Sequence, residues 1–242
     1  KIKTYLQKKQ VQNTYMRQEL PKVNEDDKLV QQRLIEHGEA RVRELEVMIP
    51  SPYFVRCHVQ FSNGKKDVLQ FGKFSWGDEQ IYSWITPASS MRFEAPGEIT
   101  YTRPDGTEVT AVLKQKDQYL ITDGNIVFLA TESLDQPREL VYQEYFSKKK
   151  DGFVLPEIVA QMEKAQDNVI RAHHKGGLLI SGPAGSGKTT LALHRVAYLV
   201  QSPDVSADFS PTKIIVFVQD ESTKDYFSHL LPELGITGVV IT

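Results

Sequence analysis

The stretch GLLISGPAGSGKTTLALHRVAYLV, residues 177–200, decides the fold of this chain. It joins an apolar run to a glycine-rich turn and then to an amphipathic helical pattern. Residues 182–189, GPAGSGKT, fit the pattern G-x-x-x-x-G-K-[ST] at every fixed position. This order of elements is typical of a phosphate-binding loop between a strand and a helix. We therefore expect a strand at 178–181 and a helix at 188–200.

Each fixed position of this glycine loop (residues 182–189) has a chemical reason. Glycines turn the backbone through positive φ and let it approach phosphate without a Cβ clash. Successive backbone N–H groups then bind anionic oxygens, with help from the helix N-terminus. Lys188 would bring a positive charge to the β- and γ-phosphates, and Thr189 would offer its hydroxyl to Mg²⁺, so these two are the candidate catalytic residues. The predicted ATP-binding residues of this region are Gly182, Pro183, Ala184, Gly185, Ser186, Gly187, Lys188, Thr189 and Thr190.

Apolar strands and helices alternate along residues 135–242. After the glycine loop and its helix come a strand at 213–218, a helix at 222–234 and a strand at 238–242. Near-continuous apolar strands separated by helices predict a parallel sheet covered on both faces. The expected fold class is α/β, with the first part of a P-loop (RecA-like) domain, because three strands do not complete such a sheet.

Two further helices are expected before the glycine loop. The first would begin at Pro137 and end at Gly152, and the second would be amphipathic and end at Gly176. Gln166 lies on the second helix, just before the strand of the loop. Its amide offers one acceptor and two donors, which match the amino group and a ring nitrogen of adenine. The alternative is an ordinary solvated side chain on a helix.

Residues 1–50 are polar, with sparse apolar positions at loose helical spacing. Pro21 would end a first helix at about residue 20, and Asn24 would cap a second helix over 25–48. The first helix carries five Lys/Arg against one Glu, and the second carries seven acidic residues against four basic ones. Oppositely charged arms attract each other. We expect a helical hairpin, or coiled-coil arm, whose thin apolar stripe leaves it exposed or open to a partner.

Residues 51–134, here called the β segment, change to short β-like runs separated by turns. The turns SNGK (62–65), PDGT (104–107) and TDGN (122–125) each place Asn-Gly or Asp-Gly between such runs. Three hairpins predict about six strands in a small antiparallel sheet or barrel. Four aromatic residues are assigned to its core rather than to a base-stacking platform: Trp76, Tyr82, Trp84 and Phe93.

The composition narrows the classes of function. The net charge is −2, so any nucleic-acid surface must be local. Cys57 is the only cysteine, which excludes an intrachain disulfide and favours a reducing compartment. No apolar run approaches the ~18 residues that span a bilayer, and the first residues lack the apolar core of a signal peptide. We expect a cytoplasmic protein without a membrane partner.

The segment AQDNVIRAHHKGGLLISGPAGSGKTTLALHRVAYLV, residues 165–200, resembles the Q motif and motif I of superfamily 1 helicases of the UvrD/Rep type. The region that begins with SPYFVRCHVQF, the N-terminal arms and LLPELG at 230–235 resemble HelD-like proteins. Those are bacterial ATPases, built from superfamily 1 motor domains, that bind RNA polymerase and help to free it from nucleic acid. The resemblance implies that Gln166 reads adenine, that Lys188 contacts phosphate and that Thr189 binds Mg²⁺.

The resemblance also places FVQDESTKDYF (217–227) where motif Ia, which touches the nucleic-acid strand in true helicases, would fall. The segment departs from the usual Thr-rich pattern, which weakens the case for a strand contact through Ser222 or Thr223. Asp220 and Glu221 mimic the end of a Walker B strand, which would hold Mg²⁺ and position water. They follow the first strand after the glycine loop, so we interpret them as a strand end or a helix entry.

Three functions remain open at this stage. The leading hypothesis is an ATP-driven enzyme that remodels or recycles RNA polymerase, and the second is a helicase or translocase on DNA. The third is a non-hydrolysing ATP-binding scaffold whose β segment and hairpin make the contacts. Hydrolysis needs a metal-side acid, a group that orients water and usually an arginine finger, and none can be assigned before Thr242. These residues alone are therefore expected to bind ATP weakly and to hydrolyse little or none of it.

Overall fold

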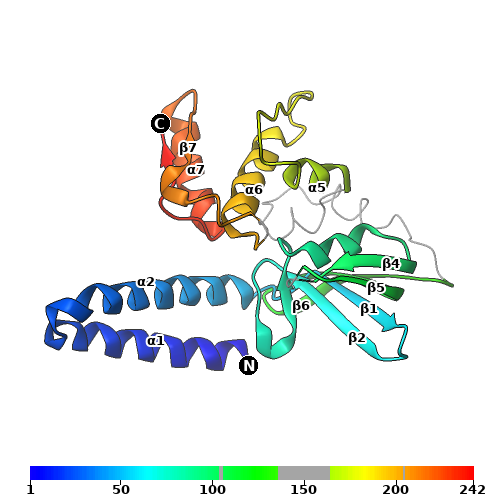
Figure 1. Cartoon of the computed structure of the whole chain (residues 1–242), viewed down its shortest axis with the longest axis horizontal. Coiled ribbons are helices and arrows are strands. Elements are labelled where there is room, and N and C mark those ends of the chain that lie inside the picture. Colours follow the sequence, from blue (N-terminus) through cyan, green and yellow to red (C-terminus); the bar gives the residue numbers. More distant parts are fainter. Residues whose placement is uncertain (104–105, 136–163, 204) are drawn as a thin grey trace.

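The computed structural model describes residues 1–103, 106–135, 164–203 and 205–242. Figure 1 shows a helical hairpin that projects from one end of a β-sheet, with a second group of helices above them. The chain is a mixed α/β structure, and both its N-terminal hairpin and its sheet precede that second group in the sequence.

The N-terminal hairpin consists of α1 (Ile2–Glu19) and α2 (Glu25–Met48), which confirms the predicted pair of helices. Pro21 lies in a short 3₁₀ turn between them, at a position where its missing N–H is not needed. Asn24 holds the N-cap position of α2 as expected, although its side chain makes no capping hydrogen bond.

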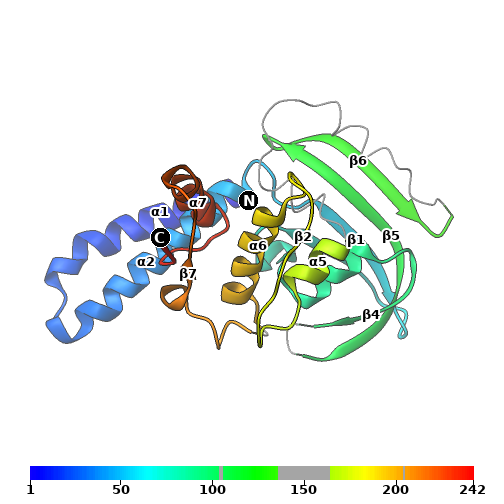
Figure 2. The same ribbon diagram turned by 90° about the horizontal axis from the view of Figure 1, so that it is seen from above.

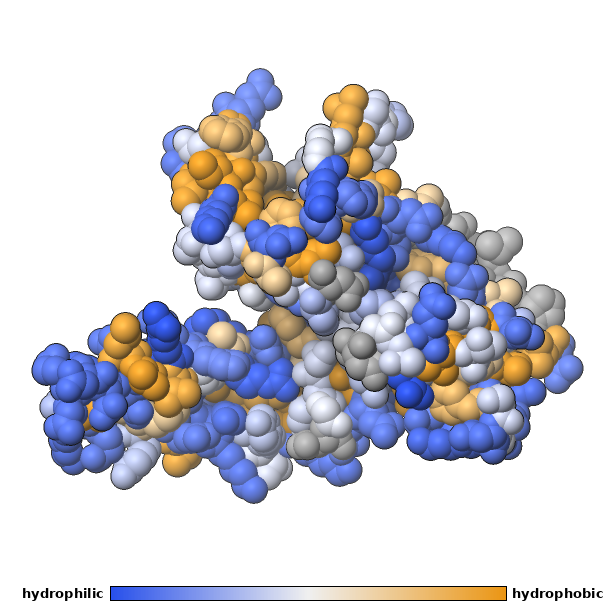
Figure 3. Space-filling view, viewed as in Figure 1, coloured by the Kyte–Doolittle hydropathy of each residue, from blue (hydrophilic) through white to orange (hydrophobic). Residues whose placement is uncertain are grey.

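The hairpin buries little apolar surface along most of its length. Arg17 forms an ion pair with Glu39 across the two helices, and Gln10 Nε2 donates to Glu46 Oε1 at 3.3 Å. The thin apolar stripe predicted from the sequence is confirmed, and Figure 3 shows apolar surface on the part of the hairpin far from the sheet. Five apolar side chains of the hairpin are more than half exposed: Val11, Tyr15, Leu29, Val30 and Leu34.

Gly38 marks a close approach of α1 and α2. A Cβ atom at Gly38 would lie 2.2 Å from Asn13 Oδ1. Asn13 is 6% exposed, and its Oδ1 and Nδ2 have no hydrogen-bond partner in the part of the chain that the structure describes. A buried amide without partners costs stability. The close approach of the two helices at Gly38 therefore has an energetic cost.

The base of the hairpin is anchored on the β segment. Arg41 Nη2 donates to the carbonyl oxygen of Ser75 at 3.0 Å. A small cluster of buried apolar side chains adds packing at the same joint: Met48, Phe74, Trp76 and Ile81.

The β segment forms a six-stranded sheet. Its strands are β1 (Val55–Phe61), β2 (Lys66–Gly72), β3 (Ile81–Ser83), β4 (Gly97–Thr102), β5 (Glu108–Thr122) and β6 (Asn125–Ser133). They lie in the order β3-β2-β1-β5-β4, and β6 also pairs with β5. Antiparallel pairs β1–β2, β4–β5 and β5–β6 confirm the three predicted hairpins.

The long strand β5 explains why three hairpins need only five strands. Its first half pairs with β4 and its second half with β6 on the same edge, whereas β1 runs along the opposite edge. The sixth strand, β3, is parallel to β2, so the prediction of a purely antiparallel sheet is wrong at this edge. Gln80 adopts a left-handed φ of 53° and turns the chain back, which places Ile81 beside Gln70.

The second group of elements comprises α5 (Lys164–Ile170), α6 (Lys188–Gln201), β7 (Ile215–Val216), α7 (Glu221–Glu233) and β8 (Val240–Ile241). Helices α6 and α7 confirm the two helices predicted after the glycine loop. Strands β7 and β8 are parallel, as expected, but each is shorter than predicted. The helix predicted from Pro137 to Gly152 lies outside the described residues.

The strand predicted at 178–181 does not form in the structure. Its residues have no regular secondary structure, and Leu178 and Leu179 are 43% and 90% exposed. A strand requires a neighbour that shares its backbone hydrogen bonds. Within the described ranges, β7 pairs only with β8, so the three-stranded parallel sheet predicted here is reduced to two strands.

One apolar core joins the sheet to the second group of helices. Figure 2 shows α5 and α6 side by side over the sheet. The predicted core positions Trp76 and Trp84 are buried, Tyr82 packs against the core, and Phe93 is partly buried beneath the Arg92 guanidinium. Side chains from both parts contribute to the same cluster, among them Val55, Cys57, Phe71, Trp84, Ile170, Leu193, Ala197 and Leu230.

We predict that Gly38→Ala stabilises the chain only when Asn13 is also replaced. Alanine favours a helix over glycine by about 1 kcal/mol, but the new methyl group would displace the Asn13 amide. In an Asn13→Ala background the space is open, so adding Gly38→Ala should raise the free energy of unfolding by about 1 kcal/mol. Urea unfolding of the four proteins, followed by circular dichroism, measures the coupling. Additive effects of the two changes would contradict the close contact.

Candidate functional site

The glycine loop forms a tight turn with an open backbone. Gly185 and Gly187 both have a φ of +77°, in the left-handed region that glycine tolerates. The Ser186 N–H donates to the Pro183 carbonyl oxygen at 3.3 Å and closes the turn. A Cβ atom at Gly182 would lie 2.9 Å from Ser186 Oγ, so only glycine fits there without a shift.

The loop ends at the N-terminus of α6. Gly187 is the N-cap residue, and the Leu191 N–H is bonded to its carbonyl oxygen at 2.9 Å. The N–H groups of Lys188, Thr189 and Thr190 come earlier in the helix, where helical geometry provides no acceptor. They are therefore available to an anion at the positive end of the helix dipole.

The side chain of Lys188 lies beside the backbone of the loop. Lys188 Nζ donates to the Pro183 carbonyl oxygen at 2.7 Å, so the ammonium group lies against the loop backbone. Ala184 and Thr189 are exposed, and Gly187 and Lys188 are half-buried. The residues thus fit a phosphate chain, with backbone donors from the turn and helix and one positive charge beside them.

Gln166 lies on α5, and its side chain is half-buried. Helix α5 packs beside α6, the helix that follows the glycine loop. The candidate for adenine recognition, Gln166, is therefore on the neighbouring helix. Helix α5 ends at Ile170, so the prediction that it continues to Gly176 is wrong.

Arg195 on α6 explains where α5 ends. Its Nη1 donates to the carbonyl oxygens of Val169, Ile170 and Ala172 at 3.2, 2.8 and 2.9 Å. Its Nη2 donates to the carbonyl oxygen of His173 at 3.0 Å. Carbonyl groups at the end of a helix lack donors within the helix. The Arg195 guanidinium on the neighbouring helix supplies these donors. The carbonyl groups are therefore hydrogen-bonded although the helix ends at Ile170.

A second arginine connects α5 to the β segment. Arg171 Nε donates to Asp167 Oδ2 at 2.8 Å. Its Nη1 donates to the Ile85 carbonyl oxygen at 3.0 Å, and its Nη2 donates to the Trp84 carbonyl oxygen at 2.7 Å and to Ser89 Oγ at 2.9 Å. The guanidinium therefore joins the P-loop side of the structure to the sheet.

Asp167 is the buried centre of this contact. It is 2% exposed, and its Oδ1 lies 3.6 Å from Nη2 of Arg92, which is 4% exposed. Burial lowers the pKa of Arg92 to about 10, and the Asp167 carboxylate opposes this shift, so Arg92 remains charged at neutral pH. Two guanidinium groups thus surround one carboxylate in the interior.

Sequence reasoning missed these charged residues. Asp167 and Arg171 have the i, i+4 spacing that allows a pair on one helix face, and that signal was readable. Their partners Ser89 and Arg92 lie about 80 residues earlier in the chain. Only the tertiary structure brings them to α5.

Asp220 caps helix α7. Its Oδ1 accepts from the Thr223 N–H at 2.8 Å, and its Oδ2 accepts from the Thr223 hydroxyl at 3.1 Å. These hydrogen bonds hold the pKa of Asp220 below its ordinary value. The interpretation of Asp220 and Glu221 as a helix entry is therefore confirmed, and the Thr223 hydroxyl is already used in the cap.

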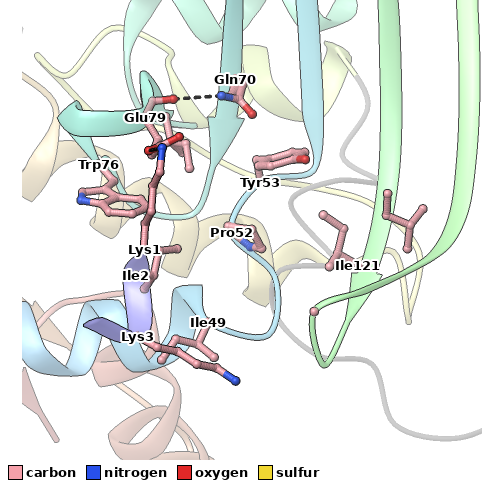
Figure 4. Close-up of a pocket in the computed structure, with 13 residues that line it drawn as sticks. Lys1, Ile2, Lys3, Ile49, Pro52, Tyr53, Gln70, Trp76, Glu79 and Ile121 are labelled. Atoms are coloured by element: carbon pink, nitrogen blue, oxygen red, sulfur yellow. Dashed lines mark hydrogen bonds and ion pairs between the residues drawn. The ribbon is translucent and has the colours of Figure 1, made fainter. Parts of the chain in front are cut away.

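A pocket of about 530 Å³ lies at the joint between the hairpin and the sheet (Figure 4). Lys1 forms an ion pair with Glu79 at 2.6 Å, and Gln70 Nε2 donates to the Glu79 carbonyl oxygen at 2.9 Å. None of its lining residues belongs to the glycine loop. We therefore assign this pocket to the hairpin joint and not to the glycine loop.

Residues 162–218 match the family model of the UvrD/REP helicase N-terminal domain. The match includes α5, the glycine loop, α6 and β7. It supports a UvrD-like superfamily 1 helicase and indicates helicase-type ATPase activity for this class of protein. A comparison of the chain with curated proteins gives no match.

Two further observations concern the described residues only. Among them, no helix has the combination of length and apolar character that a membrane span requires. The same residues contain no cluster of three or more His, Cys, Asp or Glu side chains suited to a metal ion. A Mg²⁺ site at Thr189 would instead depend on phosphate and water oxygens, which is usual for this ion.

His194 lies at the interface between α6 and the β segment. It is fully buried, its Nδ1 donates to the Thr190 carbonyl oxygen at 2.7 Å, and its ring meets Trp84 edge-on at 5.5 Å. Burial lowers the pKa of His194, the hydrogen bond to Thr190 opposes this, and Lys73 and Arg92 lower the pKa further.

We predict that His194 makes the chain less stable in mild acid. Because its pKa is lower in the folded state, the unfolded chain takes up the proton first, and stability falls as the pH drops below about 6.5. Urea midpoints at about pH 7.5 and 5.5 should differ less in His194→Leu than in the wild type. His229→Gln, at an exposed histidine, is the control. An unchanged pH dependence in His194→Leu would count against this account.

Proposed function

We propose that the glycine loop binds ATP with Mg²⁺ as part of a superfamily 1 helicase-like motor. The observation that supports this most directly is the combination of two positive-φ glycines, open N–H groups at the start of α6 and the ammonium group of Lys188 at one place. The family match covers the same residues. The residues proposed to bind ATP are those expected from the sequence, residues 182–190 and Gln166.

Each group would have a separate role. Backbone N–H groups of the loop and of the first turn of α6 would hold the phosphate oxygens, and Lys188 would add a positive charge as negative charge develops. The Thr189 hydroxyl oxygen would be a ligand of Mg²⁺, which polarises the phosphate chain when bound. Gln166 would select adenine through its amide. Asp220 is used in the α7 cap, so we do not assign it the role of a Walker B carboxylate.

The test compares the ATP affinity of two loop variants, a control variant and the wild type. Gly187→Ala should weaken ATP binding, because a non-glycine residue at a φ of +77° costs about 1–2 kcal/mol and the loop would shift. Lys188→Ala should weaken binding by roughly 10-fold or more, since it removes a charged hydrogen bond. Calorimetry with ATP and Mg²⁺ measures both. Gly177→Ala is the control, because Gly177 is not among the positive-φ glycines and a Cβ atom there would meet nothing within 4 Å. Equal affinities in all four proteins would refute the site.

We propose further that the whole protein is a HelD-like ATPase that remodels or recycles RNA polymerase. The hairpin supports this, because it projects from the sheet and carries exposed apolar side chains on a polar arm (Figures 1 and 3). Exposed apolar clusters of this kind mark interaction sites. The net charge of −2 suits a protein partner better than an extended DNA track. A DNA helicase or translocase, and an ATP-binding scaffold without hydrolysis, remain the alternatives.

Replacement of Tyr15 and Leu34 by Ser should weaken binding to bacterial core RNA polymerase. Both side chains are more than half exposed, so the fold should tolerate the change. Pull-down with the purified polymerase measures the effect, and Leu129→Ser on β6, also half exposed, is the control. Binding to DNA that falls steeply with salt, with no polymerase captured, would favour the DNA helicase instead.

A further inference from the structure

Gln166 is held next to the most constrained point of α5. The following residue, Asp167, is 2% exposed and receives the Arg171 guanidinium at 2.8 Å. A buried carboxylate cannot move away from its partners without leaving a charge unpaired in the interior. The position of Asp167 therefore fixes the backbone that carries Gln166.

The partners of Asp167 are themselves held by the β segment. Arg171 donates to the carbonyl oxygens of Trp84 and Ile85 and to Ser89 Oγ. Ser89 is fully buried in the 3₁₀ segment η3 (Pro87–Phe93), which also supplies Arg92. The location of α5 is thus set by a loop of the sheet and not only by contacts with the glycine loop.

Arg195 fixes the other side of α5. Arg195 lies on α6, the helix that follows the glycine loop. Its guanidinium donates to the last two carbonyl oxygens of α5 and to those of Ala172 and His173 just after it. Helix α5 is therefore held between the phosphate-binding helix on one side and the β segment on the other. A displacement of the β segment would move Gln166 relative to the loop.

We propose that Arg171 is a positioning residue for base recognition, through which the β segment sets how strictly the site prefers adenine. This inference rests on the proposed role of Gln166 and extends it to residues more than 70 positions earlier in the chain. The proposed phosphate contacts come from the loop and the first turn of α6, whereas the Arg171 guanidinium meets α6 at the Tyr198 ring, ten residues beyond Lys188. Its loss should therefore change base selectivity and leave phosphate binding in place.

The experiment compares three ligands: ATP, GTP and inorganic tripolyphosphate, each with Mg²⁺ and measured by calorimetry. Arg171→Ala should reduce the preference for ATP over GTP by about 10-fold, as expected for loss of a bidentate amide contact, and should leave tripolyphosphate affinity nearly unchanged. Ser89→Ala removes only one acceptor of Arg171 and should give a smaller change in the same direction. If Arg171→Ala does not fold, Ser89→Ala decides.

The controls separate positioning from general destabilisation. Glu44→Gln breaks a half-buried ion pair of the hairpin, Arg41–Glu44 at 2.6 Å, and should not alter the ATP-to-GTP ratio. A purely structural role for Arg171 would lower the affinity for all three ligands together, and that result would overturn the inference.

Gln166→Ala distinguishes failure of the role proposed for Arg171 from failure of the role proposed for Gln166. If it abolishes the preference for ATP while Arg171→Ala and Ser89→Ala do not change it, the inference fails and the proposed nucleotide site stands. If Gln166→Ala has no effect on the preference, the base-reading role is wrong, and the inference fails with it.

Discussion

A buried carboxylate with two guanidinium partners holds this structure together. Asp167 lies between Arg171, which directly follows its helix, and Arg92 from the β segment, and Arg171 also donates to the backbone oxygens of Trp84 and Ile85. Charges of this kind are retained in an interior only where each one is paired, because an unpaired buried charge is strongly destabilising. The arrangement therefore favours the observed placement of α5 on the sheet, beside the apolar core that includes Ile170 and Trp84.

The consequence is that the elements around the glycine loop and the β segment share one packed core. The core includes Trp84 and Cys57 from the sheet together with Leu193 and Ala197 from α6. Burial raises the pKa of Cys57 to about 12, so its thiol acts as a small apolar side chain in this core. The hairpin is different, because only its base is anchored and most of its length meets solvent. A packed centre with a projecting arm is an arrangement that would suit the proposed motor, in which a change at the glycine loop is passed to a partner.

Local sequence signals predicted the elements well and their partners less well. The Asn-Gly and Asp-Gly turns gave the three hairpins, and the glycine pattern correctly located the start of α6. The parallel pairing of β3 was not predicted, because it depends on how a turn at Gln80 returns the chain. The end of α5 was misplaced, since Gly176 is a stronger local stop signal than Ile170 but Arg195 acts from another helix. The strand at 178–181 was predicted from its apolar run and its place before the glycine loop, and neither signal provides the hydrogen-bonding neighbours that a strand needs.

The sequence by itself determined the glycine loop, its helix, the helical hairpin and the turns of the sheet. These features depend on backbone freedom at glycine, on the geometry of proline and on side-chain spacing, all of which are properties of neighbouring residues. Only the tertiary structure decided which buried charges meet, which helix receives the Arg195 guanidinium and how the sheet is joined to α5. Those contacts connect residues that lie up to 87 positions apart, and no local pattern in the chain encodes such a distance.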